Sequence, residues 1–466
     1  MMRRRLLSFC AALAAFSLMA APAEAMKIER VVSPGGIEAW LVEESAVPVI
    51  VMHVSWEGGS ASDPKGKEGI ANLASGLFDE GAGDLDSETF QKKLAATGAV
   101  MGFSEDRDYF EASFKTLADK RDEAFALFGL AVTKPRFDPD AVERIRAQIA
   151  TIIARNMEDP GWIAAQDWYK AAYGSHPYAR PSDGTLKSLA GLTVADLHAF
   201  KRNVLARDNM KIAVVGPITP AELAPLLDRT FGALPAHARL PKIPEVKVAA
   251  KTKTVIEKRP FPQSVVIFGR QGLKRADPDF VPAFVMNYVL GGGSFSSRLM
   301  EEVREKRGLA YSVSSYLVPL RHGAMMMGEL GSKNASVGLS LSLIRKELAR
   351  MAAGGVTDKE LADAKTYLTG SYPLRFNSNR KIAGELIGIQ TENLGIDYVD
   401  RRNAMIEAVT KEDIARVAKR LLAGNELIVS IVGEPNMSEK LPEGTKLRPM
   451  PEPTGRPTEG APGASQ

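Results

Sequence analysis

An internal duplication is the feature of the sequence that most constrains the fold. The two related segments are TVADLHAFKRNVLARDNMKIAVVG (Thr193–Gly216) and TKEDIARVAKRLLAGNELIVSIVG (Thr410–Gly433), which have equal length. Thr, Asp, an aliphatic residue, a basic residue, Leu, Val and Gly recur at matching positions, and each segment predicts a capped amphipathic helix, a turn and an apolar strand. Since a repeated pattern indicates a repeated structural unit, we expect two similar domains.

The beginnings of the two halves support this duplication. Residues 36–60 are predicted to form two strands around a turn, and residues 263–273 open the second half with a strand. Asp63-Pro64 and Asp277-Pro278 mark matching loops before helices. Strands and long helices alternate irregularly, without the regular rhythm of a parallel βαβ sheet. The predicted fold is therefore α+β, with two homologous domains that each contain a mainly antiparallel sheet covered by helices.

The N-terminal residues have the organisation of a secretory signal peptide. Arg3–Arg5 form a positive region, an apolar run extends from Leu6 to about Ala21, and Ala23-Glu24-Ala25 supplies a cleavage site. An uncleaved membrane anchor is the alternative, but the apolar run is short for a span of about 20 residues. The mature chain is expected to begin near Met26 and to be exported, with the periplasm as its expected location.

Composition divides the rest of the chain into four parts. Residues 26–233 are predicted to form the N-terminal domain and residues 255–435 the C-terminal domain. Residues 234–254 contain several prolines and lysines, which indicates an extended linker between the domains. Residues 436–466 are rich in Pro and Gly and nearly free of large apolar residues, so we expect a disordered tail.

The composition also excludes several classes of function. The chain has 466 residues, 45% of them hydrophobic, and a formal charge of only +4, with no basic stripe interleaved with aromatic residues that would indicate nucleic-acid binding. No segment after the signal peptide is expected to cross a membrane. The one cysteine, Cys10, lies in the signal peptide, so neither a disulfide framework nor a thiol nucleophile is expected in the mature chain.

The stretch GIANLASGLFDEGA (Gly69–Ala82) has the spacing of a metal-binding helix without its ligands. Apolar residues at i, i+3, i+4 and i+7 predict one buried helical face. Asn72, Ser75 and Gly76 share another face, at the offsets at which H-x-x-E-H places two zinc ligands and a general base. The histidines of the chain are scattered, with none at ligand spacing, and so they supply no replacement.

The surroundings of this stretch resemble the active-site region of the pitrilysin/insulinase-like zinc metallopeptidases, in particular the branch that contains the mitochondrial processing peptidase. The resemblance implies that Asn72 and Gly76 stand where the family has zinc-binding histidines, and that Ser75 stands at the general base. The family's third ligand, a glutamate on a later helix, falls on Ala150 in AVERIRAQIATIIARNMEDP. Because Asn, Gly and Ala do not replace imidazole and carboxylate donors, this chain is expected to bind no catalytic zinc.

The second half keeps a family signature instead. VLGGGSFSSRLMEEVREKRGLAYSVSSYL (Val289–Leu317) closely resembles the signature of the family's C-terminal domain. The resemblance implies that an arginine and a tyrosine, matched to Arg298 and Tyr311, reach across a closed chamber to the substrate near the scissile bond. It also implies substrate binding by the glycine-rich loop, here Gly291, Gly292, Gly293, Ser294 and Phe295. The charged residues between 301 and 307, Arg304 included, are interpreted as a solvated helix face.

The same resemblance implies a clamshell-like chamber and a division of work between two chains. The leading hypothesis is that this chain is the non-metal-binding subunit of an exported heterodimeric zinc metallopeptidase, and that a homologous partner holds the zinc and the general base. This chain would form half of the clamshell and contribute Arg298 and Tyr311 to the cleavage of unfolded peptides. The alternative is a non-catalytic structural or peptide-binding scaffold. A hydrolase with a different site has little support, because the sequence has no G-x-S-x-G motif.

Overall fold

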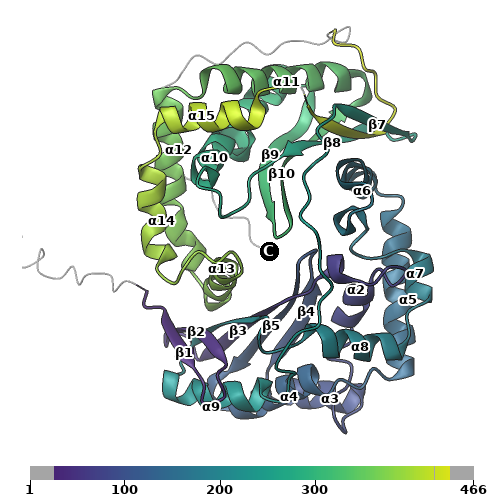
Figure 1. Ribbon diagram of the computed structural model, residues 1–466, viewed down its shortest axis with the longest axis vertical. Helices are drawn as coiled ribbons and strands as arrows, with labels where there is room; N and C mark the ends of the chain where they lie inside the picture. The colour runs from purple at the N-terminus through teal and green to yellow at the C-terminus, as the bar shows by residue number, and fades with distance from the viewer. Residues whose placement is uncertain (1–25, 425, 441–466) are drawn as a thin grey trace, which may run out of the picture.

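The computed structural model describes residues 26–424 and 426–440, which fold into two sheets covered by helices (Figure 1). The first sheet has six strands in the order β1-β2-β6-β3-β5-β4, and the second has five in the order β7-β11-β8-β10-β9. The strands are β1 (Glu29–Val32), β2 (Glu38–Glu43), β3 (Val49–Glu57), β4 (Val100–Glu105), β5 (Tyr109–Leu117), β6 (Met210–Gly216), β7 (Lys253–Lys258), β8 (Gln263–Gln271), β9 (Ala310–Leu320), β10 (Gly323–Lys333) and β11 (Ile428–Gly433). The predicted signal peptide and the predicted tail from residue 441 onward lie outside the described residues.

Helices cover both sheets (Figure 1). Those of the N-terminal half are α2 (Ile70–Ser75), α3 (Ser87–Ala96), α4 (Arg121–Thr133), α5 (Pro139–Asn156), α6 (Pro160–Tyr173), α7 (Leu186–Ala190), α8 (Val194–Val204) and α9 (Pro220–Phe231). Those of the C-terminal half are α10 (Phe280–Asn287), α11 (Val337–Gly354), α12 (Asp358–Gly370), α13 (Asn379–Thr391), α14 (Tyr398–Glu407) and α15 (Lys411–Leu422). None of the helices within the described residues has both the length and the apolar character of a membrane span.

The strand pairing confirms the predicted α+β fold and its duplication. In each sheet one neighbouring pair is parallel, β2 with β6 and β7 with β11, and the remaining neighbours are antiparallel. The two related segments form equivalent elements, because α8 leads into β6 as α15 leads into β11. Thr193 and Thr410 cap these helices, each accepting a hydrogen bond from the backbone N–H three residues later.

One helix from each half packs on the sheet of the other half. α6 contacts β8 and β11 of the second sheet, where the buried Trp168 donates from Nε1 to the carbonyl of Ile428 at 3.1 Å. α13 contacts β3 and β6 of the first sheet, where Gln390 donates to the carbonyl of Ile212 at 3.0 Å. Figure 1 shows α6 beside β7 and β8, and α13 beside the first sheet. The two halves of the sequence therefore do not correspond to two separately covered sheets.

The linker and the start of the tail differ in how far they follow the sequence prediction. Residues 235–252 connect the halves without helix or strand, as expected for the linker, although β7 already begins at Lys253. The predicted disordered tail begins at residue 436, yet the Asn436 N–H donates to the carbonyl of Asn334 at 2.8 Å. The Asn436 carbonyl in turn accepts from the N–H of Gly338 at 3.0 Å. Asn436 therefore lies against the start of α11.

Candidate functional site

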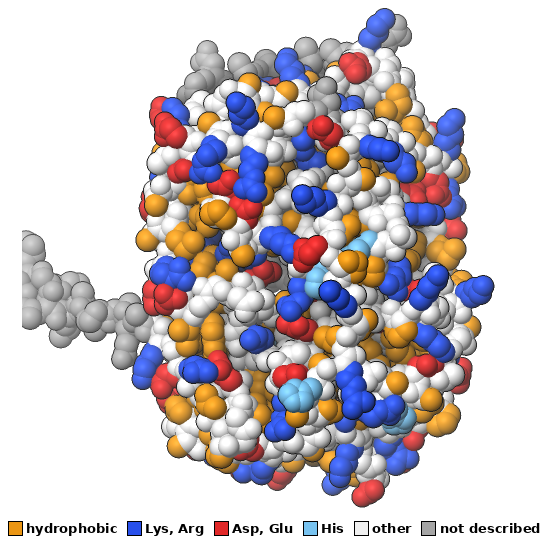
Figure 2. All heavy atoms as spheres, viewed as in Figure 1, with side chains coloured by type: hydrophobic (Ala, Val, Ile, Leu, Met, Phe, Trp, Pro, Cys, Tyr) orange, Lys and Arg blue, Asp and Glu red, His pale blue; other side chains and the backbone are white. Residues whose placement is uncertain are grey.

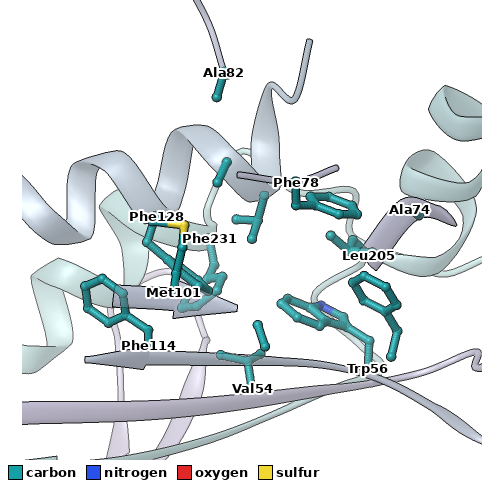
Figure 3. Close-up of a cluster of buried hydrophobic side chains, with 14 of the residues drawn as sticks. Val54, Trp56, Ala74, Phe78, Ala82, Met101, Phe114, Phe128, Leu205 and Phe231 are labelled. Atoms are coloured by element: carbon teal, nitrogen blue, oxygen red, sulfur yellow. The ribbon is translucent and has the colours of Figure 1, made fainter. Parts of the chain in front are cut away.

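The helix α2, which carries two of the four positions of the missing zinc motif and ends at a third, Gly76, belongs to the core of the N-terminal half. Ile70, Leu73 and Leu77 are almost completely buried, as the apolar periodicity predicted. Figure 3 shows the next aromatic residue, Phe78, in the same cluster as Trp56 from β3. At roughly 25 cal/mol per Å² of buried apolar surface, this face stabilises the helix whether or not a metal is present. The helix is therefore explained by packing alone.

The polar residues of α2 are occupied by hydrogen bonds within the protein. Asn72 donates from Nδ2 to Oδ1 of Asp183 at 3.2 Å, and Asn156 of α5 donates to the other oxygen of the same carboxylate at 3.4 Å. The Ser75 hydroxyl donates to the carbonyl of Asn72 at 2.8 Å, one helical turn earlier. The structure thus gives Ser75 no neighbouring group that would make it a base for water.

The remaining two positions of the motif are closed by packing. A Cβ added at Gly76 would lie 2.8 Å from Cγ2 of Ile145, so a side chain at this position requires the Ile145 side chain to move. Ala150, also on α5, is half-buried and packs against the core of the N-terminal half. The side chains at these positions do not fit zinc. Across residues 26–424 and 426–440, no group of three or more His, Cys, Asp or Glu side chains is placed to hold a metal ion.

Carboxylates nevertheless remain around the lost site. Burial, together with the charges of Asp183 and Asp106, raises the pKa of Glu105 at the end of β4 to about 7. Burial also raises the pKa of Asp63 well above its usual value, with the charge of Glu105 adding to the effect. One buried oxygen of each of these two carboxyl groups has no hydrogen-bond partner in the described structure. The protonated forms of Asp63 and Glu105 are therefore favoured, because burial outweighs the nearby charges of Arg180 and Arg107.

The glycine-rich loop of the second half allows close packing against β9. Residues Tyr288–Gly292 form a π-helical turn, and a Cβ added at Gly291 would lie 2.3 Å from Oγ of Ser315. Gly293 has little room as well, because its added Cβ would lie 2.8 Å from the carbonyl oxygen of Tyr288. Gly291 and Gly293 are buried, whereas Gly292, Ser294 and Phe295 are exposed. Of the five residues predicted to bind substrate, these three are the ones a ligand can reach.

Arg298 does not lie where the sequence comparison placed it. Its side chain is buried, with 7% of its surface exposed, and it forms a bidentate ion pair with Glu360 of α12, with N–O distances of 2.6 and 2.7 Å. Its Nη2 also donates to the carbonyl of Gly355 at 3.0 Å. Nε and Nη2 of this guanidinium are therefore engaged inside the domain, and Nη1 lies 3.9 Å from the sulfur of Met351. The structure gives Arg298 a role in holding α12, not a position in an open chamber.

A different arginine lies beside Tyr311. The Tyr311 side chain is 76% exposed at the start of β9, and the guanidinium carbon of Arg304 lies 5.7 Å from the centre of its ring. The same guanidinium lies 4.9 Å from the ring centre of Phe295, which is 63% exposed. Arg304 is carried by the π-helical segment Met300–Glu305, and its only carboxylate neighbour in the described structure is Glu305, at 3.7 Å. The sequence interpretation assigned Arg304 to a solvated helix face and so missed it, although Arg304 lies between two exposed aromatic residues, Phe295 and Tyr311.

A large cavity adjoins this cluster. It has a volume of about 1270 Å³ and is bounded by β9, the glycine-rich turn and the helices α10, α12, α13 and α14. Ser312, which follows Tyr311, and Ser294, which precedes Phe295, both line it. Figure 2 shows Lys and Arg side chains interspersed with Asp and Glu over this side of the molecule, without a large area of one sign. Arg304, Tyr311 and Phe295 do not line the cavity themselves, but they lie beside its rim at Ser294 and Ser312 and are taken with it as the candidate site.

Comparison with known proteins decides the family. The model described as "Insulinase (Peptidase family M16)" matches residues 42–185, and the model described as "Peptidase M16 inactive domain" matches residues 191–368. A crystal structure of a peptidase M16 inactive domain from Pseudomonas fluorescens is 30% identical, superposes with a TM-score of 0.83, and is matched over 89% of this chain and 99% of that chain. This chain belongs to peptidase family M16. The resemblance seen in the sequence is thereby confirmed.

Among M16 relatives, similarity extends to proteins described with and without activity. The "Non-peptidase homolog YmxG" of Helicobacter pylori is 26% identical over 336 residues, which cover 72% of this chain and 77% of the relative. The "Uncharacterized zinc protease SCO5738" of Streptomyces coelicolor is 27% identical over 413 residues, covering 87% and 89% respectively. A family member whose four motif positions are occupied by Asn72, Ser75, Gly76 and Ala150 is an M16 fold without the family's metal chemistry.

Proposed function

We propose that this chain is the non-metal-binding subunit of an exported, heterodimeric zinc metallopeptidase that cleaves unfolded peptides. A homologous partner with an intact zinc motif would supply the metal and the general base, and this chain would supply Tyr311 and Arg304. The alternative is a non-catalytic scaffold of the same fold. The observation that carries the proposal is the exposed Arg304–Tyr311–Phe295 cluster beside a large cavity, in a chain whose own metal site is closed.

The donors of this cluster are available to a ligand. The Tyr311 hydroxyl has no hydrogen-bond partner among the described residues, and its ring is held from one side by the Arg304 guanidinium. Cation–π contacts of this kind contribute about 0.5–1 kcal/mol at exposed sites, which is enough to orient a ring without fixing it. A phenol and a guanidinium together provide neutral and charge-assisted donors for peptide carbonyl or carboxylate oxygens. A purely structural surface gives no reason to expose these groups together.

The proposed location and partner follow from separate features. The signal-peptide pattern of residues 1–25 supports export to the periplasm. The closed packing at Gly76 and Ala150 supports the need for a zinc site on another chain. The cavity, which is larger than the ~300–1,000 Å³ of ordinary small-molecule pockets, supports a peptide as the substrate.

The test compares the chain isolated from its native host with the chain produced alone. Tagged chain recovered under mild conditions is assayed for phenanthroline-sensitive cleavage of an unstructured peptide, and we expect cleavage only in the native eluate. Tyr311→Phe and Arg304→Met, each reintroduced into the host, should lower kcat by about 10²-fold, the usual effect of losing one transition-state donor. Arg345→Met is the matched control, because Arg345 is exposed on α11, away from the cavity.

Each result has a distinct meaning. Cleavage by the lone chain would overturn the assignment of residues 72–76 as a lost metal site. Cleavage that persists unchanged in Tyr311→Phe and Arg304→Met would favour the scaffold, with catalysis entirely in the partner. Absence of cleavage in the native eluate, with the chain recovered intact, would also favour the scaffold.

A further inference from the structure

We propose that a pocket between the linker and α8 binds a small organic anion, that is, an apolar molecule with a carboxylate or phosphate group. The pocket has a volume of about 560 Å³, within the ~300–1,000 Å³ typical of small-molecule sites. It is bounded by residues 61–67, the start of α2, α8 and linker residues 239–243, and Figure 1 shows the linker running past α2 and α8. It shares no lining residue with the cavity beside β9, so this site is separate from the proposed peptide site.

Positive charge prevails along the lining of this pocket. Lys and Arg contribute five side chains and the acids only two, namely Lys65, Lys67, Arg180, Arg239 and Lys242 against Asp63 and Asp196. In the described part of the chain, only two of the five have a carboxylate within ion-pair distance: Lys67 lies 2.7 Å from Asp196, and Arg180 lies 3.8 Å from Glu68. The other three come from the loop before α2 and from the linker, which are far apart in sequence, and fold to the same pocket. Their charges are available to a carboxylate or a phosphate.

The linker residues of the pocket are held in place by backbone hydrogen bonds. The N–H of Arg239 donates to the carbonyl of Asn203, near the end of α8, at 2.8 Å. Further along, the N–H of Val246 donates to the carbonyl of His322 at 2.8 Å. Since the linker is fixed on both sides of the pocket, Arg239 and Lys242 stay beside it without a ligand. Binding then does not have to order a free segment.

The cation on the opposite side of the pocket is positioned as well. Nη1 of Arg180 donates to the carbonyl of Asp63 at 2.8 Å, and the side chain keeps 27% of its surface exposed. A carbonyl oxygen fixes the guanidinium without neutralising its charge. Arg180 therefore contributes positive potential to the pocket before any ligand arrives.

The two acids of the lining oppose an anion only weakly. Oδ2 of Asp196 accepts hydrogen bonds from Nζ of Lys67 and from the Thr193 hydroxyl, both at 2.7 Å. Asp63 is 4% exposed, and burial raises its pKa well above the usual value, which favours its neutral form. The excess of positive charge in the pocket is therefore kept.

An apolar wall favours an organic anion over a free inorganic ion. Ile70 of α2 and Phe200 and Val204 of α8 line the pocket and belong at the same time to the core of the N-terminal half. Leu240 and Ile243 of the linker, both half-buried, line it as well. Walls that are mostly apolar, with a few polar groups that fix orientation, are characteristic of small-molecule sites. The ring or alkyl part of a ligand would pack on these side chains while its anionic group meets the cations.

The test measures binding of phenyl phosphate, and of benzoate as the corresponding carboxylate, to the whole mature chain by isothermal titration calorimetry. Phenol and inorganic phosphate supply the ring and the anion alone, and each should bind at least ~10-fold more weakly than phenyl phosphate. Arg239→Met and Lys242→Met should each weaken binding by about fivefold, roughly the effect of one exposed ion pair, and the double variant by more than about tenfold. Both side chains are exposed, so the unfolding curve should not change. Lys251→Met is the matched control, because Lys251 is an exposed linker residue that does not line the pocket.

Each outcome supports or overturns the site. Binding of either anion that weakens in the double variant and not in Lys251→Met supports it, and the tighter of the two probes identifies the preferred anionic group. Equal affinity for phenyl phosphate and inorganic phosphate would overturn the organic part of the ligand, and equal affinity for phenol would overturn the role of charge. Unchanged affinity of the double variant, or no binding of either anion, would overturn the site itself. Peptide cleavage by the native complex tests the proposed function independently of all these results.

Discussion

We predict that Arg298 stabilises the fold and does not bind substrate. A single substitution tests this prediction. Arg298→Met keeps most of the volume of the side chain and removes its charge. Glu360 then remains half-buried without its bidentate partner, and the carbonyl of Gly355 loses a donor. Arg304→Met, six positions later on the exposed cluster, is the matched comparison because it removes an arginine with no bidentate partner.

The structure sets the size of the effect. Breaking a buried ion pair from one side costs about 3–5 kcal/mol, because an uncompensated charge is left behind. Burial alone would raise the pKa of Glu360, but hydrogen bonds from Arg298 and Thr357 lower it to about 2. At an unfolding entropy of about 2.1 cal/mol/K per residue, a chain of this length loses ~1 °C per kcal/mol, so the expected loss in Tm for Arg298→Met is roughly 3–6 °C. Arg304→Met should change Tm by less than about 2 °C, since its contacts are exposed.

The assay is thermal unfolding followed by circular dichroism at neutral pH and again in acid. The stabilisation by Glu360 is present above its usual pKa of 4.5 and is lost as the pH falls toward 2, so the difference between wild type and Arg298→Met should shrink in acid. The double variant Arg298→Met/Glu360→Gln should recover part of the loss, because no charge is stranded. An unchanged Tm for Arg298→Met, combined with loss of cleavage in the native complex, would refute the reasoning and return Arg298 to the substrate.

Further substitutions test the other sites. Gly76→His should destabilise the chain by about 1–3 kcal/mol through overpacking against Ile145, which urea unfolding measures. The double variant Gly76→His/Ile145→Ala should still bind no zinc, which metal analysis checks. Glu105→Gln removes an acid whose pKa is raised to about 7. Wild type should therefore lose up to ~3 kcal/mol relative to this variant as the pH rises from about 4.5 to 7, measured by unfolding across that range. Gln390→Leu removes a side-chain donor to the carbonyl of Ile212, which still lies in the ladder between β2 and β6, and should cost about 0.5–1.5 kcal/mol in the same assay.

The fold was largely predictable because its information is local and repeated. Short-range sequence patterns that occur twice predict the capped helices at Thr193 and Thr410 and the apolar strands that follow them. The exchange of α6 and α13 was not predictable, because periodicity says which face of a helix is apolar and not which sheet covers it. The sequence around Trp168 does not distinguish packing on the first sheet from packing on the second.

The candidate site shows a similar division. The loss of zinc ligands at positions 72, 76 and 150 follows from residue chemistry alone and needs no coordinates. The choice between Arg298 and Arg304 does not, because both stand in the same signature and differ only in their surroundings. The partner of Arg298 is Glu360, on a helix far along the sequence, and that contact exists only after folding. The two exposed aromatic residues that flank Arg304, Phe295 and Tyr311, were the available signal.

The exchanged helices have a consequence for how a chamber built from this chain can admit its contents. A hinge motion at residues 235–252 would have to break the contacts of Trp168 with the second sheet and of Gln390 with the first. The two halves of the chain are therefore expected to move as one rigid body. In the proposed heterodimer, a peptide would then enter the chamber through the interface between the two subunits. The rate at which a peptide enters would depend on how often the two subunits separate. Stronger association of the subunits would therefore slow turnover even when every contact with the peptide is unchanged.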